Sequence, residues 1–203
     1  MSNVDTILSR ARHALGLSTL YWLGEGGMHP DAPLPSSSLA VGRLWPTLPA
    51  AQRMELEPIA QAHGIDVHDP DLVLDACDCS GYVCWVLGTS RHVDHASFAG
   101  GDGWIFTDSI WADAMGPGTL FKRLDAARPG ALVVYPKEGS HENFGHVGIV
   151  IEADAAGRAT LVAHCSAANM QDGPFDSIKI TTPAVFERQP RSIYAAYRGD
   201  NTA

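Results

Sequence analysis

Apolar residues near the start of the chain recur at the spacing of an amphipathic helix. Polar residues separate five apolar positions that share one helical face: Val4, Ile7, Leu8, Ala11 and Leu15. Gly16 follows as a stop signal, so the pattern predicts a helix that ends near Gly16.

Residues 50–62 form a second segment with apolar positions at helical spacing. Pro58 interrupts this pattern, and a proline inside a helix removes one backbone hydrogen bond. Two short helices are therefore as compatible with the pattern as one continuous helix.

The apolar run over residues 80–87 fits a buried helix or a buried strand by periodicity alone. Asp78 and Ser80 offer side-chain oxygens that can cap a helix start, and Gly88 offers a stop. We therefore predict a helix here, and a further helix over residues 107–115.

Beyond residue 130 the pattern changes to short β-rich runs separated by turn residues. Five strands are predicted, at residues 131–135, 145–152, 159–165, 177–181 and 192–197. Helices followed by a meander of strands indicate an α+β fold.

The length of 203 residues suits a single domain, 1–203, with its own hydrophobic core. Residues 29–50 are rich in Pro and Ser, and neither flank makes a self-sufficient core. This stretch is therefore predicted to be a surface excursion and not a linker between domains.

The charge balance argues against two classes of partner. The formal net charge is −9, and no run of basic residues exceeds two. Without a cationic stripe, we expect no binding to nucleic acid or to anionic membrane surfaces. No apolar run is long enough to cross a bilayer, so no membrane insertion is expected.

The N-terminus lacks the basic head and continuous apolar core of a secretory signal. Four cysteines, three of them crowded at Cys77, Cys79 and Cys84, do not resemble a disulfide framework. A cytoplasmic location is the default expectation, and export that needs no cleavable signal is the alternative.

Three short motifs concentrate the chemistry: Asp-Cys-Ser-Gly-Tyr at 78–82, Gly-His-Val-Gly-Ile-Val at 145–150 and Leu-Val-Ala-His at 161–164. They supply what a cysteine nucleophile, a histidine base and a residue that orients the base require. A helix start offers Cys79 unpaired N–H groups and a positive dipole end, which favour thiolate and can hold an oxyanion. Gly81 is expected to leave room for a substrate.

The two histidines are spaced for a hairpin. The midpoint of His146 and His164 is residue 155, inside the turn-like segment 154–157. A hairpin closed there places both side chains opposite or nearly opposite each other on one face. A slip of one residue would turn His164 away and bring Cys165 round instead.

Each motif also has a plain structural interpretation. A single Asp-Cys-Ser-Gly is more often a buried cysteine at a helix cap, and a single strand histidine is more often a partial-core residue. The order and spacing of all three favour catalysis. Metal sites at Cys77, Cys79 and Cys84, or at His92 and His95, have unfavourable spacing or context, so neither metal nor cofactor is expected.

The three motifs, read in this order, resemble the NlpC/P60 family of papain-like cysteine peptidases. The aromatic-glycine segment 21–24 and the run 129–133 are similar to further parts of the same family. The resemblance implies a papain-like α+β fold, with N-terminal helices and the nucleophile helix packed on an antiparallel sheet.

The resemblance implies roles for six residues. Cys79 would be the nucleophile, His146 the base and His164 the orienting residue. Three further residues would bind substrate, one bordering the nucleophile and two contacting an amino group: Tyr21, Asp78 and Ser80.

Many family members cleave peptide bonds in bacterial cell-wall stems or their turnover fragments, so the resemblance implies a small peptide or cell-wall fragment as substrate. Two extended segments, at about 28–77 and 89–128, depart from the family pattern and are expected to form walls over the cleft. The resulting hypothesis is a cysteine hydrolase that cleaves an amide bond. Two alternatives are a thioester-forming acyltransferase on the same scaffold and a non-catalytic binding module.

Overall fold

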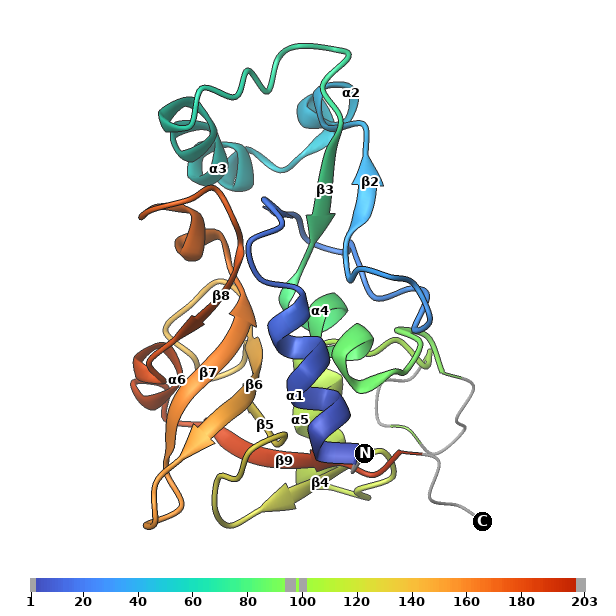
Figure 1. Ribbon diagram of the computed structural model, residues 1–203, viewed down its shortest axis with the longest axis vertical. Helices are drawn as coiled ribbons and strands as arrows, with labels where there is room; N and C mark the ends of the chain where they lie inside the picture. Colours follow the sequence, from blue (N-terminus) through green and yellow to red (C-terminus); the bar gives the residue numbers. More distant parts are fainter. Residues whose placement is uncertain (1–2, 94–97, 99–101, 200–203) are drawn as a thin grey trace.

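The computed structural model of the protein describes residues 3–93, 98 and 102–199. Its body is a six-stranded antiparallel sheet with the strand order β4-β9-β5-β6-β7-β8 (Figure 1). The strands are β4 (Phe121–Leu124), β5 (Leu132–Tyr135), β6 (His146–Ala153), β7 (Ala159–Cys165), β8 (Ile178–Thr181) and β9 (Ile193–Tyr197). The five predicted strands are present. β4 has no clear apolar alternation, because the charged Lys122 and Arg123 occupy its centre at the sheet edge.

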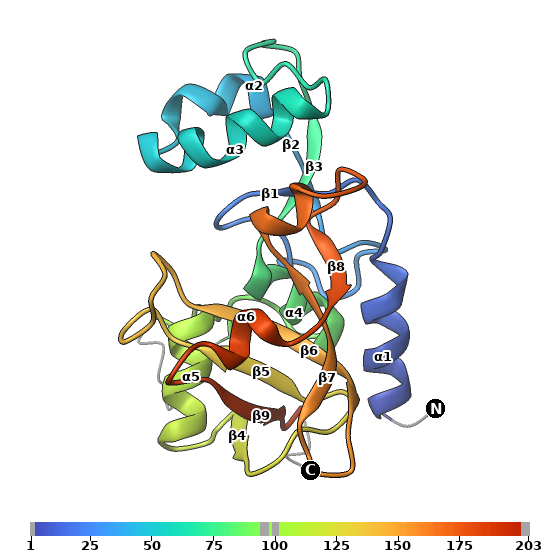
Figure 2. The same cartoon turned by 90° about the vertical axis from the view of Figure 1, so that its left-hand side faces the viewer.

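Helices cover both faces of this sheet unequally. On one face lie α1 (Asn3–His13), α4 (Cys79–Leu87) and α5 (Thr107–Met115), and on the other lies the short α6 (Ala184–Glu187) (Figures 1 and 2). The α+β prediction, with the 79–87 helix packed on an antiparallel sheet, is therefore confirmed.

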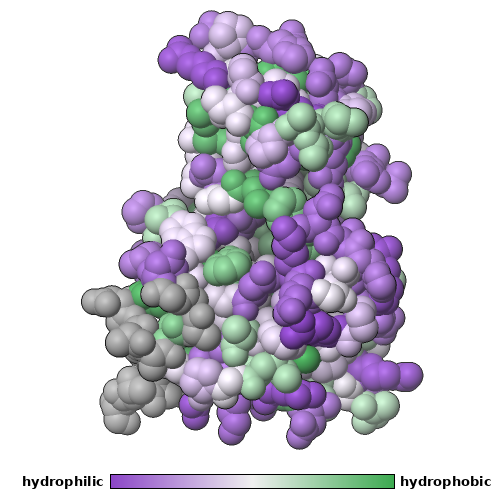
Figure 3. Space-filling model, turned by 180° about the vertical axis from the view of Figure 1, so that it is seen from behind, coloured by the Kyte–Doolittle hydropathy of each residue, from purple (hydrophilic) through white to green (hydrophobic). Residues whose placement is uncertain are grey.

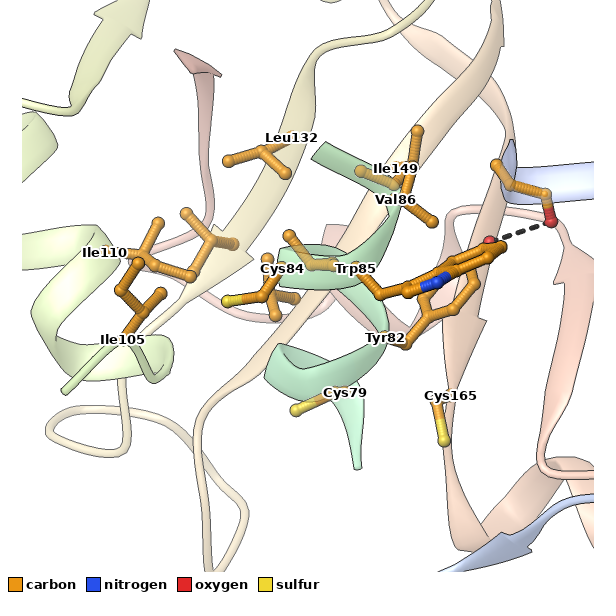
Figure 4. Close-up of a cluster of buried hydrophobic side chains, with 14 of the residues drawn as sticks. Cys79, Tyr82, Cys84, Trp85, Val86, Ile105, Ile110, Leu132, Ile149 and Cys165 are labelled. Atoms are coloured by element: carbon orange, nitrogen blue, oxygen red, sulfur yellow. Dashed lines mark hydrogen bonds between the residues drawn. The ribbon is translucent and has the colours of Figure 1, made fainter. Parts of the chain in front are cut away.

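The centre of the core is α4, which is buried on all sides except at its last residue. Tyr82 projects toward α1, where its hydroxyl donates to the Ala11 carbonyl at 3.0 Å (Figure 4). Elsewhere α4 packs against Ile149 of β6 and against Ile105 and Ile110. A helix that is apolar all round has no amphipathic pattern, which explains why periodicity alone could not identify it.

A second, smaller sheet rises from the body in the order β1-β3-β2. Its strands are β1 (Leu20–Tyr21), β2 (Ser37–Leu39) and β3 (Leu74–Cys77), and at its far end lie α2 (Val41–Leu44), a short 3₁₀ turn (Trp45–Thr47) and α3 (Ala50–Ala62). The interpretation of residues 29–50 as a surface excursion missed β2 and α2. In the view from behind, hydrophobic residues gather between this upper part and the body (Figure 3).

The structure decides between the two readings of residues 50–62, because α3 is one helix with Pro58 inside it. Pro58 is exposed, as is Met54 four residues earlier, so the Met54 carbonyl that loses its partner lies on the water side. α1 ends at His13, slightly before the predicted stop at Gly16, whose φ is +75°. Among the described residues, no helix combines the length and apolar character needed to span a membrane.

Candidate active site

The chain places Cys79 at the junction of β3 and α4. Asp78 is extended (φ −112°, ψ 179°) and caps the helix, its Oδ1 accepting the Gly81 N–H at 2.7 Å. The Asp78 N–H donates to the Glu25 carbonyl at 3.0 Å. The first N–H groups of a helix have no partner within the helix. Among the described residues, the N–H groups of Cys79 and Ser80 have no other partner either.

Asp78 is also held by a buried arginine that the sequence analysis did not identify. Its Oδ2 accepts from Arg91 Nη2 and, at 2.7 Å, from the Gly24 N–H. Ser80 Oγ donates to Asp78 Oδ1 at 3.0 Å and accepts from Arg91 at 2.8 Å. The Arg91 and Asp78 side chains are 2% and 5% exposed, so this is a buried ion pair.

This network changes the interpretation of Asp78 and Ser80 as contacts for a substrate amino group. Both side chains lie at the edge of a cavity, but the carboxylate is neutralised by Arg91 and accepts four donors. A substrate ammonium would have to displace a buried guanidinium. The geometry favours a structural role for both residues: Asp78 caps the helix, and Ser80 helps to hold the Asp78 carboxylate.

The expectation for Gly81 is also corrected. A Cβ at Gly81 would collide with the carbonyl of Glu25, and one at Gly27 would collide with the backbone of Gly81. The glycine therefore permits close packing of the 25–27 backbone against the helix start, and it does not open space for a substrate.

Tyr21 lines the same cavity as Cys79. β1 runs parallel to β3 with Tyr21 paired to Cys77, and the Trp22 N–H donates to the Cys77 carbonyl at 3.0 Å. Tyr21 is half-buried. Burial, followed by the proximity of Cys79 and Asp78, raises the pKa of its hydroxyl well above the usual value.

The surroundings of Cys79 oppose the thiolate that a helix start would favour. The residue is 6% exposed. Burial and then the Asp78 carboxylate raise its pKa, and the Arg91 charge and a hydrogen bond from the Val147 N–H oppose them only in part. Desolvation thus outweighs the helix dipole at this position.

The other three cysteines lack this environment. Cys77, Cys84 and Cys165 are wholly buried, and burial raises the pKa of Cys84 to about 12. Cys165 donates to the Cys77 carbonyl at 3.3 Å. Within the described residues no group of three His, Cys, Asp or Glu side chains could hold a metal, and His95 lies outside them.

His146 and His164 are brought together by β6 and β7. His146 Nε2 and His164 Nδ1 are 2.8 Å apart, and the rings meet edge to face. The register pairs Ile149 with Ala163, so His164 lies opposite Gly148 and diagonal to His146. The hairpin is centred on residue 156 and not 155, which offsets the pairing by two residues. Because the shift is by two residues, both histidines keep the same face.

The alternation of β6 determines what surrounds His146. Val147 and Ile149 pack toward α4, while the His146 ring turns toward α6, where Phe186 stacks on it with centroids 5.1 Å apart. Phe186 also meets His164 edge to face. The thiol of Cys79 is therefore at the backbone of β6, and among the described residues no hydrogen bond joins it to the His146 ring.

The buried histidines predict acid sensitivity of the fold. Burial lowers the pKa of His164 to about 4, and burial together with His164 lowers that of His146 well below its usual value. The unfolded chain, with histidine pKa near 6.5, then binds more protons. The contribution of these neutral histidines to the free energy of unfolding is fully present above about pH 6.5 and is lost as the pH falls toward about 4. His164 alone accounts for a loss of about 3 kcal/mol.

Urea unfolding of wild type, His164→Asn and the exposed-site control His68→Asn at several pH values between 7.5 and 4 measures this effect. We expect a shallower pH dependence for His164→Asn than for wild type or His68→Asn. Equal pH dependence in the three proteins would contradict a neutral, buried His164.

Two cavities meet above these residues. One, of about 420 Å³, is lined by Cys79, Arg91, Trp104 and Phe106, and the other, of about 190 Å³, includes His146. They share four lining residues: Tyr21, Leu23, Phe144 and Gly145. Together they form a groove with a nucleophile arm and a histidine arm.

Both extended segments contribute to this groove. Gln52, Glu55 and Leu56 of α3 line the histidine arm. Trp104 and residues 106–108 line the nucleophile arm. Motif analysis missed Arg91 because it has no local signal, although a buried Asp78 would require a charge partner. It also missed Phe186 and Thr181, which reach the histidines from other elements.

Comparison with known families agrees with this geometry. Residues 73–165, from β3 through β7, match the CHAP domain, a segment that contains Cys79, His146 and His164. CHAP domains are related to NlpC/P60 cysteine peptidases and amidases, so the papain-like resemblance is confirmed. The match indicates cysteine peptidase or amidase activity on a peptidoglycan-type substrate. No curated protein matches the chain.

Proposed function

Starting from the CHAP match, we propose that the protein hydrolyses an amide bond in a small peptidoglycan-type peptide. Cys79 is the nucleophile, His146 the base and His164 the residue that orients the base. The observation that carries this proposal is the 2.8 Å hydrogen bond between His146 and His164. The next residue after His146, Val147, directs its N–H at Cys79, so the histidine pair and the cysteine lie at the same strand end.

The chemistry starts from a neutral thiol and a neutral imidazole. His146 Nε2 is engaged by His164, which leaves Nδ1 to accept the Cys79 proton as the sulfur attacks the substrate carbonyl carbon. Substrate binding has to bring Nδ1 within hydrogen-bond reach of Sγ. The N–H groups of Cys79 and Ser80 then stabilise the oxyanion.

The second half of the reaction returns both groups to their starting forms. The His146 imidazolium protonates the leaving amine, and a thioester remains on Cys79. His146 next takes a proton from water as it attacks the thioester carbonyl, and that proton passes to the departing Cys79 sulfur. The products are an amine and a carboxylic acid.

The groove supports a small or thin substrate. Trp104, Phe106 and Phe144 give the nucleophile arm aromatic walls, and α3 closes the histidine arm. In this proposal residues 1–203 act as one catalytic domain, and the segments at about 28–77 and 89–128 set substrate size. Such a groove accepts an extended peptide more readily than a folded protein.

The test compares purified stem peptides, with free and with acetylated N-termini, against intact wall material and casein. We expect cleavage of the small peptides, at similar rates for free and acetylated forms, because Asp78 is already paired with Arg91. The matched control is Cys79→Ala. Preference for casein would contradict the small-substrate proposal. A strong preference for free N-termini would support the hypothesis that Asp78 binds the substrate ammonium.

The same assay separates the two alternatives. Transfer of the acyl group to an added amine in place of water indicates the acyltransferase. Failure to trap an acyl-enzyme with any of these peptides indicates the binding module.

A further inference from the structure

A threonine on β8 extends the histidine pair. His164 Nε2 lies 2.8 Å from Thr181 Oγ1, and Thr181 Oγ1 lies 3.0 Å from the Thr182 carbonyl oxygen. The register pairs Lys179 with His164, so Thr181 is diagonal to His164 just as His164 is diagonal to His146. Three side chains thus form one hydrogen-bonded line across β6, β7 and β8.

The direction of every hydrogen bond in this line follows from its last member. A carbonyl oxygen can only accept, and a hydroxyl has one hydrogen to donate. Thr181 therefore donates to the Thr182 carbonyl and accepts from His164 Nε2–H. A neutral His164 protonated at Nε2 has a bare Nδ1, which must accept from His146 Nε2–H.

We infer that Thr181 is a positioning residue that selects the ring tautomer of both histidines and thereby leaves His146 Nδ1 unprotonated. This nitrogen is the one that the mechanism requires as the base. A hydrogen bond from His146 Nε2–H also holds the ring against rotation. The kinetic part of this inference rests on the proposed function, whereas the tautomer assignment does not.

The neutral form of both rings supports the assignment. His146 and His164 are 7% and 3% exposed, and Phe186 covers both of them. Burial is the leading cause that lowers the pKa of each ring, so each carries one proton at neutral pH. A singly protonated ring has to choose between two nitrogens, and the Thr181 hydroxyl makes that choice.

The test uses Thr181→Val, which removes the hydroxyl at nearly constant shape, and Thr181→Ser, which keeps it. The matched control is Thr182→Val, since the exposed neighbour keeps the carbonyl that accepts the bond. Imidazole ¹⁵N NMR of the intact protein reports the tautomers. We expect Nε2–H for both rings in wild type, Thr181→Ser and Thr182→Val, and a mixed His164 population in Thr181→Val.

The kinetic expectation for Thr181→Val is a fall of about tenfold in kcat at nearly unchanged KM, the effect of one lost hydrogen bond, with recovery in Thr181→Ser. An Nδ1–H tautomer of His164 in wild type, or unchanged tautomers in Thr181→Val, would overturn the inference. A protein that shows the expected tautomers but cleaves no peptide would instead contradict the proposed function alone.

Discussion

Cys79→Ala and His146→Ala are each expected to lower kcat by about 10⁴-fold or more, because one removes the nucleophile and the other the base. His164→Asn should retain part of the activity, since an amide oxygen can still accept the His146 Nε2–H. Initial rates on the cleaved stem peptide measure all three. Cys84→Ala is the matched cysteine control and should stay active, because Cys84 packs in the core among apolar side chains.

Iodoacetamide labelling followed by peptide mapping gives an independent reading of the same site. Cys79 should be modified first, because it lines a cavity and is 6% exposed, whereas the other three cysteines are wholly buried. The raised pKa of its thiol predicts slow labelling at neutral pH and faster labelling as the pH rises. Preferential labelling of Cys84 or Cys165, or full activity in His146→Ala, would refute the assigned roles.

The catalytic pieces could be predicted because each depends on local sequence. Asp78 caps the helix that begins at Cys79, and the hairpin turn near residue 155 puts His146 and His164 on one face. The offset of two residues was not predictable from the spacing, because the hairpin is centred on residue 156 and not 155: Ala153 pairs with Ala159 just as Ile149 pairs with Ala163. The irregularities between these pairs cancel and leave the offset unchanged. Because the offset is an even number of residues, both histidines stay on the same face of the sheet and still contact each other.

What could not be predicted depends on contacts between different structural elements. Arg91, which follows the end of α4, folds back to Asp78 at the start of that helix, and Thr181 contacts His164 from the neighbouring strand. Neither has a motif of its own. The ionisation state of Cys79 also required the fold, because the helix start favours thiolate while burial, which only the packed structure reveals, opposes it more strongly.

Arg91→Met is expected to destabilise the protein by about 3–5 kcal/mol, because it leaves the buried Asp78 carboxylate without its counter-charge. Urea unfolding measures the loss. The matched control is Arg43→Met, which removes an arginine from an exposed pair with Asp71 and should cost less than about 1 kcal/mol.

The double variant Asp78→Asn with Arg91→Met identifies the cause of that loss. An asparagine oxygen still accepts the Gly81 N–H but carries no charge, so it should recover part of the stability lost in Arg91→Met. If Arg91→Met cost no more than Arg43→Met, the Asp78 carboxylate would not depend on Arg91. It would then be available to a substrate ammonium, and the cleavage of free and acetylated stem peptides would have to differ. The stability experiment therefore tests whether Asp78 depends on Arg91, and the substrate assay tests whether the same carboxylate binds a substrate ammonium.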